Sequence, residues 1–430
     1  MKNFRFCGVR VIPSRCVLVL PARSCSCRGG GAGADLSSRF VFLRSSEIAK
    51  SVYNTGVKIF SADAVKGEFV TMQHKKRIVL LFGGQSSEHD VSCVSGATVA
   101  RNINRDKYDV LLIGITKDGS WLKAESVEQM ESGEWLNSHV SASLLPDAGL
   151  KSVLLDDDGA LSLVRVDVLF PVLHGLYGED GCVQGLAELA QIPYVGCGVL
   201  SSSVTMDKAT TKAVLDRLGV PQARYLAFRR EEMEDMDGLC DRIEAELGWP
   251  VFVKPSNAGS SCGISKAKDR DSLKAALELA ASHDCKLVVE EAIVGRELEC
   301  AALGGWNAKI SGVGEILAAA EFYDYDAKYK NAESRTVLSA DLPAGKEDEI
   351  RAIAKKVYRA LDCDGLSRVD FFLEQGTDRV IFNEINTIPG FTSISMYPKL
   401  WETAGVPLPE LVERLIATAS VTPHHPAQNA

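Results

Sequence analysis

The sequence lacks any apolar run approaching the roughly 20 residues that a helix needs to cross a membrane, and runs such as residues 16–20 are far too short. It also lacks an excess of basic residues, because Asp and Glu number 57 and Lys and Arg only 48. A nucleic-acid-binding surface gathers Lys and Arg against phosphate, so a net charge of −9 argues against one. We therefore expect neither a membrane nor a nucleic acid as a partner.

No disulfide framework is visible among the twelve cysteines. Four lie at the N-terminus, the others are scattered singly, and none forms a CxxC pair. In a chain of 430 residues this distribution is typical of reduced thiols, so we expect a cytoplasmic protein. Cys25-Ser26-Cys27 has no matching second pair and is a weak candidate for a metal site.

The N-terminal segment, residues 1–71, is expected to lie outside the fold. Residues 1–34 contain six basic residues and no Asp or Glu, a composition that resembles an organelle transit peptide. The alternative is a start codon assigned too far upstream, with Met72 directly before the first apolar strand. We favour this second interpretation.

Residues 72–197 alternate apolar strands with helices. The strand at 78–82 ends at Gly83-Gly84, and the strand at 166–173 ends at His174-Gly175. A helix with an apolar face of Val183, Leu186 and Leu189 follows. Strand, glycine turn and helix in this order predict an α/β domain with a doubly wound parallel sheet, whose ligand edge lies at the carboxyl ends of the strands.

Two further blocks, 198–290 and 291–419, precede a tail at 420–430. The first begins with a helix at 208–218, followed by a strand at 251–254, a loop of small residues and a helix from about Asp271. The second contains strands, a long polar loop and a helix with Ile350, Ile353, Val357 and Leu361 on one face. A hairpin closes it.

This hairpin carries the strongest chemical signal. One strand covers 367–373 and the other 380–384, so symmetric pairing about the turn sets Asp370 nearly opposite Glu384. Asn386 projects from the same face as Glu384 if the strand continues. Two carboxylates and an amide oxygen suit Mg²⁺ shared with phosphate, whereas single acids on strands are usually solvated.

A loop of Gly and Ser follows the strand that ends at Lys254. Its residues 256–263 offer backbone N–H groups and hydroxyls to phosphate oxygens, although such a loop alone is more often a simple turn. It is not a Walker A loop, because no Gly-Lys-Ser/Thr follows. Together with the hairpin, it predicts a nucleotide clamp.

Three further segments carry weaker signals. The strand at 286–289 ends in Glu290 and Glu291, and these, with Glu297, suit adenine and ribose, although solvated acids are the commoner case. Residues 83–89 and 174–180 follow apolar strands, where substrate loops of open α/β sheets lie. Glu88 suits an ammonium group and His174 a carboxylate, but a single His after a strand is more often structural.

Seven segments in order resemble the D-alanine–D-alanine ligase family of the ATP-grasp superfamily. They span about residues 72–418 and comprise 81–92, 174–185, 192–208, 253–265, 289–300, 321–329 and 383–401. The resemblance implies an N-terminal substrate domain followed by a two-lobed ATP-grasp domain. It implies ATP-dependent joining of two D-alanines through a D-alanyl phosphate, for peptidoglycan precursor synthesis.

The resemblance also implies a role for each matching residue. It assigns nucleotide binding to Lys208, Lys254, Ser261, Glu290, Glu291, Ile293, Glu297 and Lys328, and two Mg²⁺ (or Mn²⁺) ions to Asp370, Glu384 and Asn386. It assigns catalysis to Glu88, Ser260, Tyr329, Arg368 and Gly390, and the two alanines to His174, Ser395 and Met396. A hydrogen-bonded link from Glu88 through Ser260 to Tyr329, an oxyanion site at Arg368 and the Gly390 N–H, a lid at about 322–340 and a homodimer follow from it as well.

Two alternatives remain within this interpretation. A D-alanyl-D-lactate or D-alanyl-D-serine ligase differs mainly in the second subsite and the lid, where Tyr329 favours D-alanine as the acceptor. A non-catalytic nucleotide-binding relative would have lost Asp370, Glu384, Asn386 or Arg368, and all four are present. A nicotinamide oxidoreductase is discounted, because the segment after the first strand lacks GxGxxG.

Overall fold

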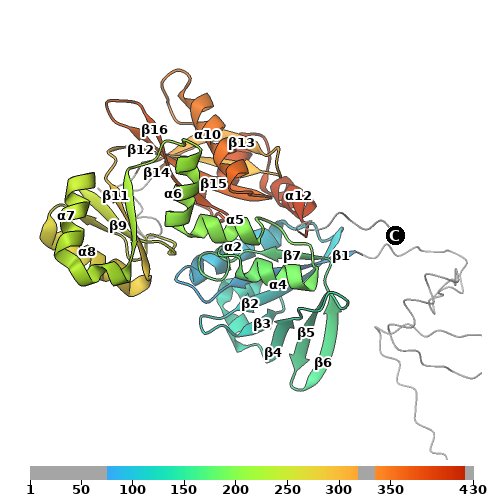
Figure 1. The fold of residues 1–430 in the computed structure, drawn as a ribbon. Helices are drawn as coiled ribbons and strands as arrows, with labels where there is room; N and C mark the ends of the chain where they lie inside the picture. The colour runs from blue at the N-terminus through green and yellow to red at the C-terminus, as the bar shows by residue number, and fades with distance from the viewer. Residues whose placement is uncertain (1–74, 318–334, 422–430) are drawn as a thin grey trace, which may run out of the picture. The chain divides into compact units, whose positions relative to one another are not determined.

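The computed structural model describes residues 75–317 and 335–421, and these form three separate β-sheets (Figure 1). The expected N-terminal segment 1–71 and most of the expected lid lie outside the described residues. Within the described ranges, no helix combines the length and apolarity needed to span a bilayer.

The first sheet has seven strands in the order β6-β5-β4-β3-β2-β1-β7. The strands are β1 (Lys76–Gly83), β2 (Tyr108–Ile115), β3 (Trp121–Ala124), β4 (Val140–Leu144), β5 (Ser152–Asp157), β6 (Ala160–Arg165) and β7 (Val168–Pro171). Only β1 pairs in parallel, with β2 and β7, and the other neighbours are antiparallel. The α/β character is confirmed, but the antiparallel half was not expected. It arises because the links from β2 to β3 and from β5 to β6 are too short for the crossover that parallel pairing requires.

Helix α2 (His89–Asn102) follows β1 and the loop at 83–89, and α4 (Cys182–Ala190) and α5 (Val199–Met206) follow β7 and the loop at 174–180. In α4, Val183, Gln184, Ala187 and Ala190 are buried, a spacing that defines the inner face of the helix. Leu189 falls on the opposite side and is 66% exposed, so its predicted place on the apolar face was wrong. The short helix α3 (Val127–Ser132) and the 3₁₀ turn η2 (Glu134–Asn137) connect β3 to β4.

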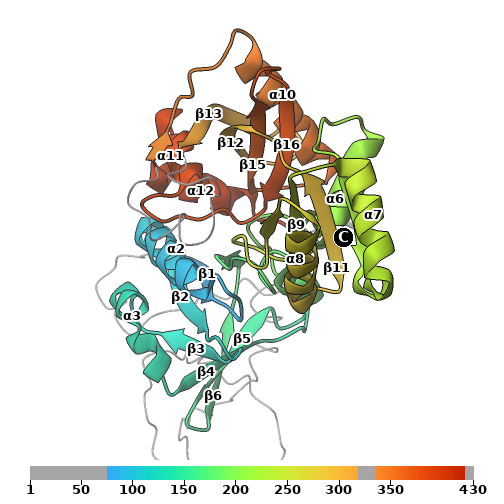
Figure 2. The same cartoon turned by 90° about the vertical axis from the view of Figure 1, so that its left-hand side faces the viewer.

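The second sheet is antiparallel, with the order β10-β9-β11-β8. It contains β8 (Tyr225–Arg229), β9 (Val251–Pro255), β10 (Ser265–Ala267) and β11 (Lys286–Glu291). Helices α7 (Met236–Leu247) and α8 (Arg270–His283) pack against it in one apolar cluster (Figure 2), and the 3₁₀ turn η3 (Arg230–Asp235) precedes α7. Helix α6 (Lys208–Arg217) leads into this lobe. The short β10 was not predicted, and it makes the Gly/Ser loop the turn of a β9–β10 hairpin.

The third sheet, with the order β14-β13-β12-β15-β16, carries the expected hairpin. Its strands are β12 (Gly295–Leu303), β13 (Lys309–Leu317), β14 (Arg335–Val337), β15 (Leu366–Glu374) and β16 (Val380–Asn386). Helices α10 (Lys346–Ala360) and α11 (Met396–Thr403) contact this sheet. Ile350 and Val357 are fully buried on α10, as the periodicity predicts.

The last helix, α12 (Leu408–Thr418), returns to the first sheet. Glu413 accepts hydrogen bonds from Tyr108 Oη and Lys107 Nζ, both at 3.0 Å, and Ser420 pairs with Tyr194. Residues of α12, α2 and β1 share one hydrophobic cluster. Helix α12 and Ser420 therefore tie the C-terminal part of the described chain to the first sheet.

Candidate active site

Glu88 lies where the loop after β1 enters helix α2, and its side chain is buried. Its carboxylate accepts a short hydrogen bond from the hydroxyl of Ser260, 172 residues further along the chain. This bond between Glu88 and Ser260 is the contact that the resemblance implies.

Two glycines make room for the Glu88 carboxylate. A Cβ on Gly259 would lie 2.2 Å from Glu88 Oε2, and one on Gly175 would lie 2.6 Å from the same atom. Gly175 also has a φ of +73°, a backbone conformation that other residues rarely adopt. A Cβ at either position would displace the Glu88 carboxylate, and Gly175 also needs glycine for its backbone conformation.

A cavity of about 70 Å³ joins the three parts of the chain at this point. Glu88 and Glu179 come from the first domain, and Lys208, Ser260 and Ser261 border the second sheet. The third sheet contributes Glu384 and Asn386. Six residues predicted from separate motifs therefore line one cavity: Glu88, Lys208, Ser260, Ser261, Glu384 and Asn386.

His174 follows β7 and its side chain is buried. Both ring nitrogens make hydrogen bonds. Nδ1 lies 2.7 Å from the Ile388 carbonyl and therefore carries the proton, while Nε2 lies 3.0 Å from Ser95 Oγ and accepts from it. Burial lowers the pKa of the imidazole, although the nearby Glu88 opposes this shift. His174 joins the first domain to the segment after β16, and its contact with a substrate carboxylate stays a prediction.

Glu179 is a site residue that the sequence patterns did not single out. Its two carboxylate oxygens accept from the backbone N–H groups of Gly175 and Ile388, both at 2.8 Å. Burial and the charge of Glu88 raise its pKa to about 8. Its position in 174–180, directly before Asp180, gave no sign that it reaches the segment after β16.

The Gly/Ser loop is shaped for contact with an anion. Ser260 and Ser261 both adopt positive φ angles, +47° and +58°. Such a conformation costs free energy in a residue other than glycine, and residues strained in this way cluster at ligand sites. Lys208 Nζ donates to the Ala258 carbonyl at 2.6 Å, so the first predicted phosphate lysine already contacts this loop. Burial lowers the pKa of Lys208, and Glu384 is the strongest influence that opposes this.

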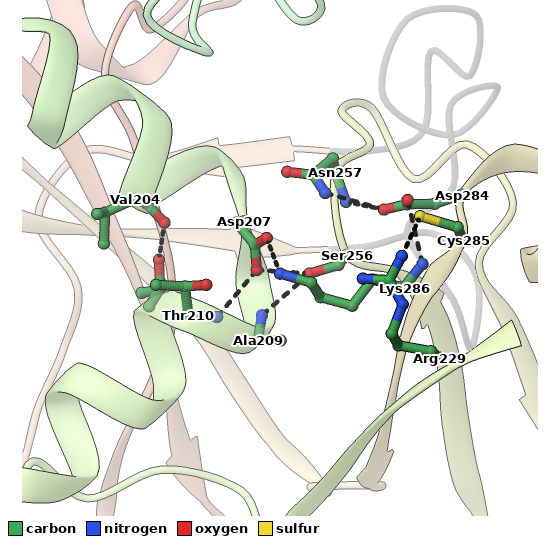
Figure 3. Close-up of polar contacts among 11 residues, drawn as sticks. Val204, Asp207, Ala209, Thr210, Arg229, Ser256, Asn257, Asp284, Cys285 and Lys286 are labelled. Atoms are coloured by element: carbon green, nitrogen blue, oxygen red, sulfur yellow. Dashed lines mark hydrogen bonds and ion pairs between the residues drawn. The ribbon is translucent and has the colours of Figure 1, made fainter. Parts of the chain in front are cut away.

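Asp207 anchors the base of the loop to helix α6 (Figure 3). Its carboxylate caps the helix by accepting from the Thr210 N–H at 2.9 Å, and it also accepts from Ser256 Oγ at 2.8 Å and from Lys286 Nζ. Burial alone would raise the pKa of Asp207, but Lys286 and these hydrogen bonds lower it. Asn257 is fixed in turn by Asp284, which accepts from its backbone and its side chain at 2.8 Å and 3.0 Å.

The second predicted phosphate lysine, Lys254, donates to Glu290 Oε2 at 2.8 Å. Glu290 is buried between Lys254 and Lys212, so it is not the solvated acid common at strand ends. Glu291 accepts from Arg224 Nε at 2.6 Å and is about one-fifth exposed. Ile293 and Glu297 are partly exposed in the same region, and their contacts with a nucleotide stay predictions.

The hairpin places the predicted metal ligands as expected, because Asp370 pairs with Glu384 in the register of β15 and β16. Asn386 ends β16, and its amide donates to Asp370 Oδ2 at 3.1 Å. The Arg368 guanidinium donates to both carboxylate oxygens of Asp370, at 2.8 Å and 2.6 Å. Its Nε also lies 3.1 Å from Glu299 Oε2. Burial alone would lower the pKa of Arg368, but Asp370 and Glu299 hold it well above its usual value. Two carboxylates and an amide at one position are the hard oxygen donors that suit a divalent cation.

Gly390, Ser395 and Met396 follow in the segment after β16. Ser395 Oγ accepts from the Thr392 N–H at 3.0 Å, which closes a tight turn beside Gly390. Met396 is buried in the first hydrophobic cluster, with its methyl group against Gly314. Its predicted contact with a second alanine is not visible in these packing contacts and stays a prediction. Lys328 and Tyr329 lie outside the described residues.

The comparisons with known proteins agree with this arrangement. The family described as D-ala D-ala ligase N-terminus matches residues 77–197, and the one described as D-ala D-ala ligase C-terminus matches 214–417. The D-alanine–D-alanine ligase of Acetivibrio thermocellus is 50% identical over 363 residues, which cover 81% of this chain and 96% of that protein. The ligase of Ruminiclostridium cellulolyticum is 49% identical, over 80% of this chain and 95% of that protein.

Solved structures give the same result. The VanG D-Ala:D-Ser ligase of Enterococcus faecalis superposes with a TM-score of 0.73 at 38% identity, over 80% of this chain and 99% of that one. The D-alanine-D-alanine ligase of Coxiella burnetii gives 0.69 at 34% identity, over 80% and 95%. The fold is thus that of ATP-grasp enzymes, and the chain is an ATP-dependent ligase that joins a carboxylate to an amine. More narrowly, the chain belongs to the D-alanine–D-alanine ligase family, whose members use ATP and a divalent metal ion.

Proposed function

We propose that this protein joins two D-alanines into D-alanyl-D-alanine, with ATP converted to ADP and phosphate, for peptidoglycan precursor synthesis. The observation that carries the proposal is the hydrogen bond from Ser260 to Glu88 in a cavity that Lys208, Glu384 and Asn386 also line. One cavity thus offers a carboxylate for an amino acid's ammonium group, a cation for phosphate and oxygen donors for a metal. Relatives named D-alanine–D-alanine ligase, about 50% identical over nearly their whole length, support the same conclusion.

The first step needs an activated carboxylate, because a free carboxylate has no good leaving group. In our proposal Glu88 binds the ammonium group of the first D-alanine and His174 lies near its carboxylate, which is thereby aligned with the γ-phosphate. Lys208, Lys254 and the loop at Ser260 and Ser261 bind the phosphates, and Lys328 reaches the γ-phosphate. Glu290, Glu291, Ile293 and Glu297 lie at the adenosine. Transfer of the γ-phosphoryl group to the carboxylate gives the acyl phosphate and ADP.

The second step is the attack of the deprotonated amine of the second D-alanine on the acyl carbon. A tetrahedral oxyanion forms, and Arg368 and the Gly390 N–H would stabilise it before phosphate leaves. Ser395 and Met396 are proposed to lie at the second alanine. Tyr329 and the segment that carries it are proposed to complete the site and exclude water.

Asp370, Glu384 and Asn386 would hold the divalent cations, and we propose two Mg²⁺ or Mn²⁺ ions. The donor set fits such ions, since it supplies carboxylate and amide oxygens and no soft ligand. When bound, the cations neutralise the charge of the phosphate oxygens.

A D-alanyl-D-serine ligase is the second candidate, because the VanG D-Ala:D-Ser ligase has 38% identity and a TM-score of 0.73. Tyr329 favours D-alanine as the acceptor in our proposal. The decisive residues of the second subsite are few, and discrimination between acceptors of similar size often rests on a few kcal/mol.

Phosphate release by residues 72–430 with Mg-ATP tests the proposal. Turnover with D-alanine alone, and D-alanyl-D-alanine as the product, is the expected result, and L-alanine is the control. Turnover only after D-serine or D-lactate is added would show that the protein is a D-alanyl-D-serine or D-alanyl-D-lactate ligase instead. No turnover with any of these substrates would indicate a nucleotide-binding relative without activity.

We also propose a cytoplasmic homodimer. The eight cysteines in the described ranges are all unpaired, which suits a reducing compartment. Three leucines in this region are exposed. Leu176, in the loop before α4, is 44% exposed, Leu189 on α4 is 66% exposed and Leu200 on α5 is 65% exposed. Helices α4 and α5 contact each other, and exposed leucines on two such helices support an interface there. We further propose the domain boundaries 72–197, 198–290 and 291–419.

A further inference from the structure

Lys212 is a buried lysine that belongs to none of the motifs described above. It lies one helical turn after Lys208 on α6, and its side chain is almost fully buried. Its ammonium group lies 3.2 Å from Glu290 Oε1 and 5.2 Å from the ring centroid of Tyr225. An ammonium group is costly to bury unless it is paired, and Glu290 is the partner of Lys212.

Glu290 holds two lysines at once. Oε2 lies 2.8 Å from Lys254 Nζ, and Oε1 faces Lys212. Burial alone would raise the pKa of Glu290, but the two lysines lower it to about 2. The carboxylate is therefore ionised at neutral pH, and two cations with one anion leave this triad with a net positive charge.

The surroundings of Lys212 fix it in this position. Tyr225 on β8 lies under its ammonium group, and the Tyr225 hydroxyl donates to Asp216 Oδ2 at 2.8 Å. Gln222 Nε2 donates to the Lys212 carbonyl at 3.0 Å. Burial lowers the pKa of Lys212, and Glu290 opposes this shift. Among the smaller influences, Lys254 lowers the pKa further and Asp216 raises it. The charge of Glu290 also acts on Lys208, a further lysine in this region.

We propose that Lys212 is a positioning residue for ATP binding, which neutralises Glu290 so that the charge of Lys254 stays available to the nucleotide phosphates. If Lys212 were absent, the pair of Lys254 and Glu290 would be neutral. A buried carboxylate would then stand beside the phosphate site and repel the phosphate oxygens. The side chain of Lys212 is only 3% exposed, against 15% for Lys254, so Lys254 is the more accessible lysine and Lys212 acts through Glu290. This inference rests on the proposed use of ATP by this site.

The test compares the effect of removing Lys212 in two backgrounds. Binding of a non-hydrolysable ATP analogue with Mg²⁺ to the full chain is measured by calorimetry for the wild type, K212M, E290Q and K212M/E290Q. We expect K212M to weaken binding by about tenfold, a size common for coupled charged groups. In the E290Q background, however, loss of Lys212 should change binding by less than about threefold, because no carboxylate charge remains to be neutralised.

Three further measurements separate this role from a structural one. K212R keeps the charge and should restore most of the affinity, and the KM for D-alanine should change little in K212M. K274M is the matched control, because Lys274 is an ion-paired lysine on α8, 2.7 Å from Asp237 and more than a third exposed. Its affinity for the analogue should equal that of the wild type.

Two results would overturn the inference. One is wild-type affinity in K212M. The other is an equal loss on removing Lys212 with and without Glu290, which would show that Lys212 contacts the nucleotide directly or only supports the fold. If K212M does not fold, the comparison of E290Q with K212M/E290Q still decides. A wild-type protein that does not bind the analogue would contradict the proposed function instead.

Discussion

Glu88 shows how much of this site depends on single residues. Its carboxylate is confined by Gly175, Gly259 and the hydroxyl of Ser260, which come from two loops distant in sequence. A side chain at either glycine would displace the carboxylate. The position of Glu88 therefore depends on the absence of a Cβ at Gly175 and Gly259.

Replacing Gly259 by alanine tests this confinement. The new Cβ would lie 2.2 Å from Glu88 Oε2, so the carboxylate must move and its bond with Ser260 must break. We expect kcat/KM for D-alanine to fall by about 100-fold, the cost of misplacing a reacting group by about 1 Å. The control is G185A, because a Cβ at Gly185 of helix α4 meets nothing within 4 Å. Unchanged kinetics in G259A would contradict the argument.

Glu179 gives a prediction for the pH dependence of stability. Its pKa is raised from 4.5 to about 8, so the folded protein binds this proton more tightly than the unfolded chain. The contribution to the free energy of unfolding is therefore present at low pH and is lost as the pH rises from about 4.5 to about 8. E179Q cannot titrate, so we expect the Tm of the wild type to fall steadily relative to that of E179Q between pH 5 and pH 8.5.

Thermal unfolding across this range measures the difference. E278Q, at an exposed position of helix α8, should follow the wild type at every pH. A Tm difference between wild type and E179Q that stays constant with pH would exclude titration of Glu179 as the cause.

At this scale the sequence predicts some contacts and misses others for physical reasons. Asp370 and Glu384 lie opposite each other as predicted, but the turn alone does not cause this. The register next to the turn would pair Asp370 with Asn383, and a bulge between Asp370 and Phe371 shifts the pairing to Glu384. The contact of Glu179 with Ile388 was missed, as was the contact of Lys212 with Glu290. Both join residues far apart in the chain, and nothing in local spacing encodes such a contact.

At the scale of elements, the start of helix α6 and the start of the Gly/Ser loop are one unit. Asp207 caps the helix, binds Ser256 at the foot of the loop and pairs with Lys286 on β11 (Figure 3). Lys208 is the first residue of the helix, so the cap also sets the direction of a proposed phosphate lysine.

We expect D207A to lower the free energy of unfolding by about 1 to 2 kcal/mol through the lost cap, and to raise the KM for ATP. D207N keeps an oxygen for the Thr210 N–H and should lose less stability. S126A is the matched control, since Ser126 caps α3 by accepting from Gln129 N far from the site. It should lower stability without changing the KM for ATP. Chemical denaturation measures the free energy of unfolding, and steady-state kinetics measure the KM for ATP. A D207A protein with an unchanged KM for ATP would show that the helix cap does not position the phosphate lysine.

Elements with a strong apolar period were predicted best. Strands β1 and β9 and helices α6, α8 and α10 lie within a few residues of their expected positions. The antiparallel strands β3 to β6 were missed. Length is not the reason, since β5 and β6 have six residues and β9 has five, but β6 is an edge strand that is largely exposed and carries little apolar pattern. Leu189 was misplaced because helical periodicity does not reveal which side of a helix meets a partner.

At the scale of the whole molecule, the exposed leucines of α4 and α5 give a testable oligomeric state. We expect the wild type to sediment as a dimer at micromolar concentration and L189E/L200E to sediment as a monomer, because each charge would be buried unpaired in the interface. L279E on α8, where Leu279 is 45% exposed, is the control and should remain dimeric. A monomeric wild type, or a dimeric L189E/L200E, would contradict this interface.

The bond between Glu88 and Ser260 has a thermodynamic consequence for the whole molecule. It connects the residue proposed to bind the first amino acid with the loop proposed to bind the nucleotide. Any ligand that changes the population of this bond must change the affinity of the other site, and linkage requires the factor to be equal in both directions. The dissociation constant for D-alanine should therefore shift with nucleotide by the same ratio as the dissociation constant for nucleotide shifts with D-alanine.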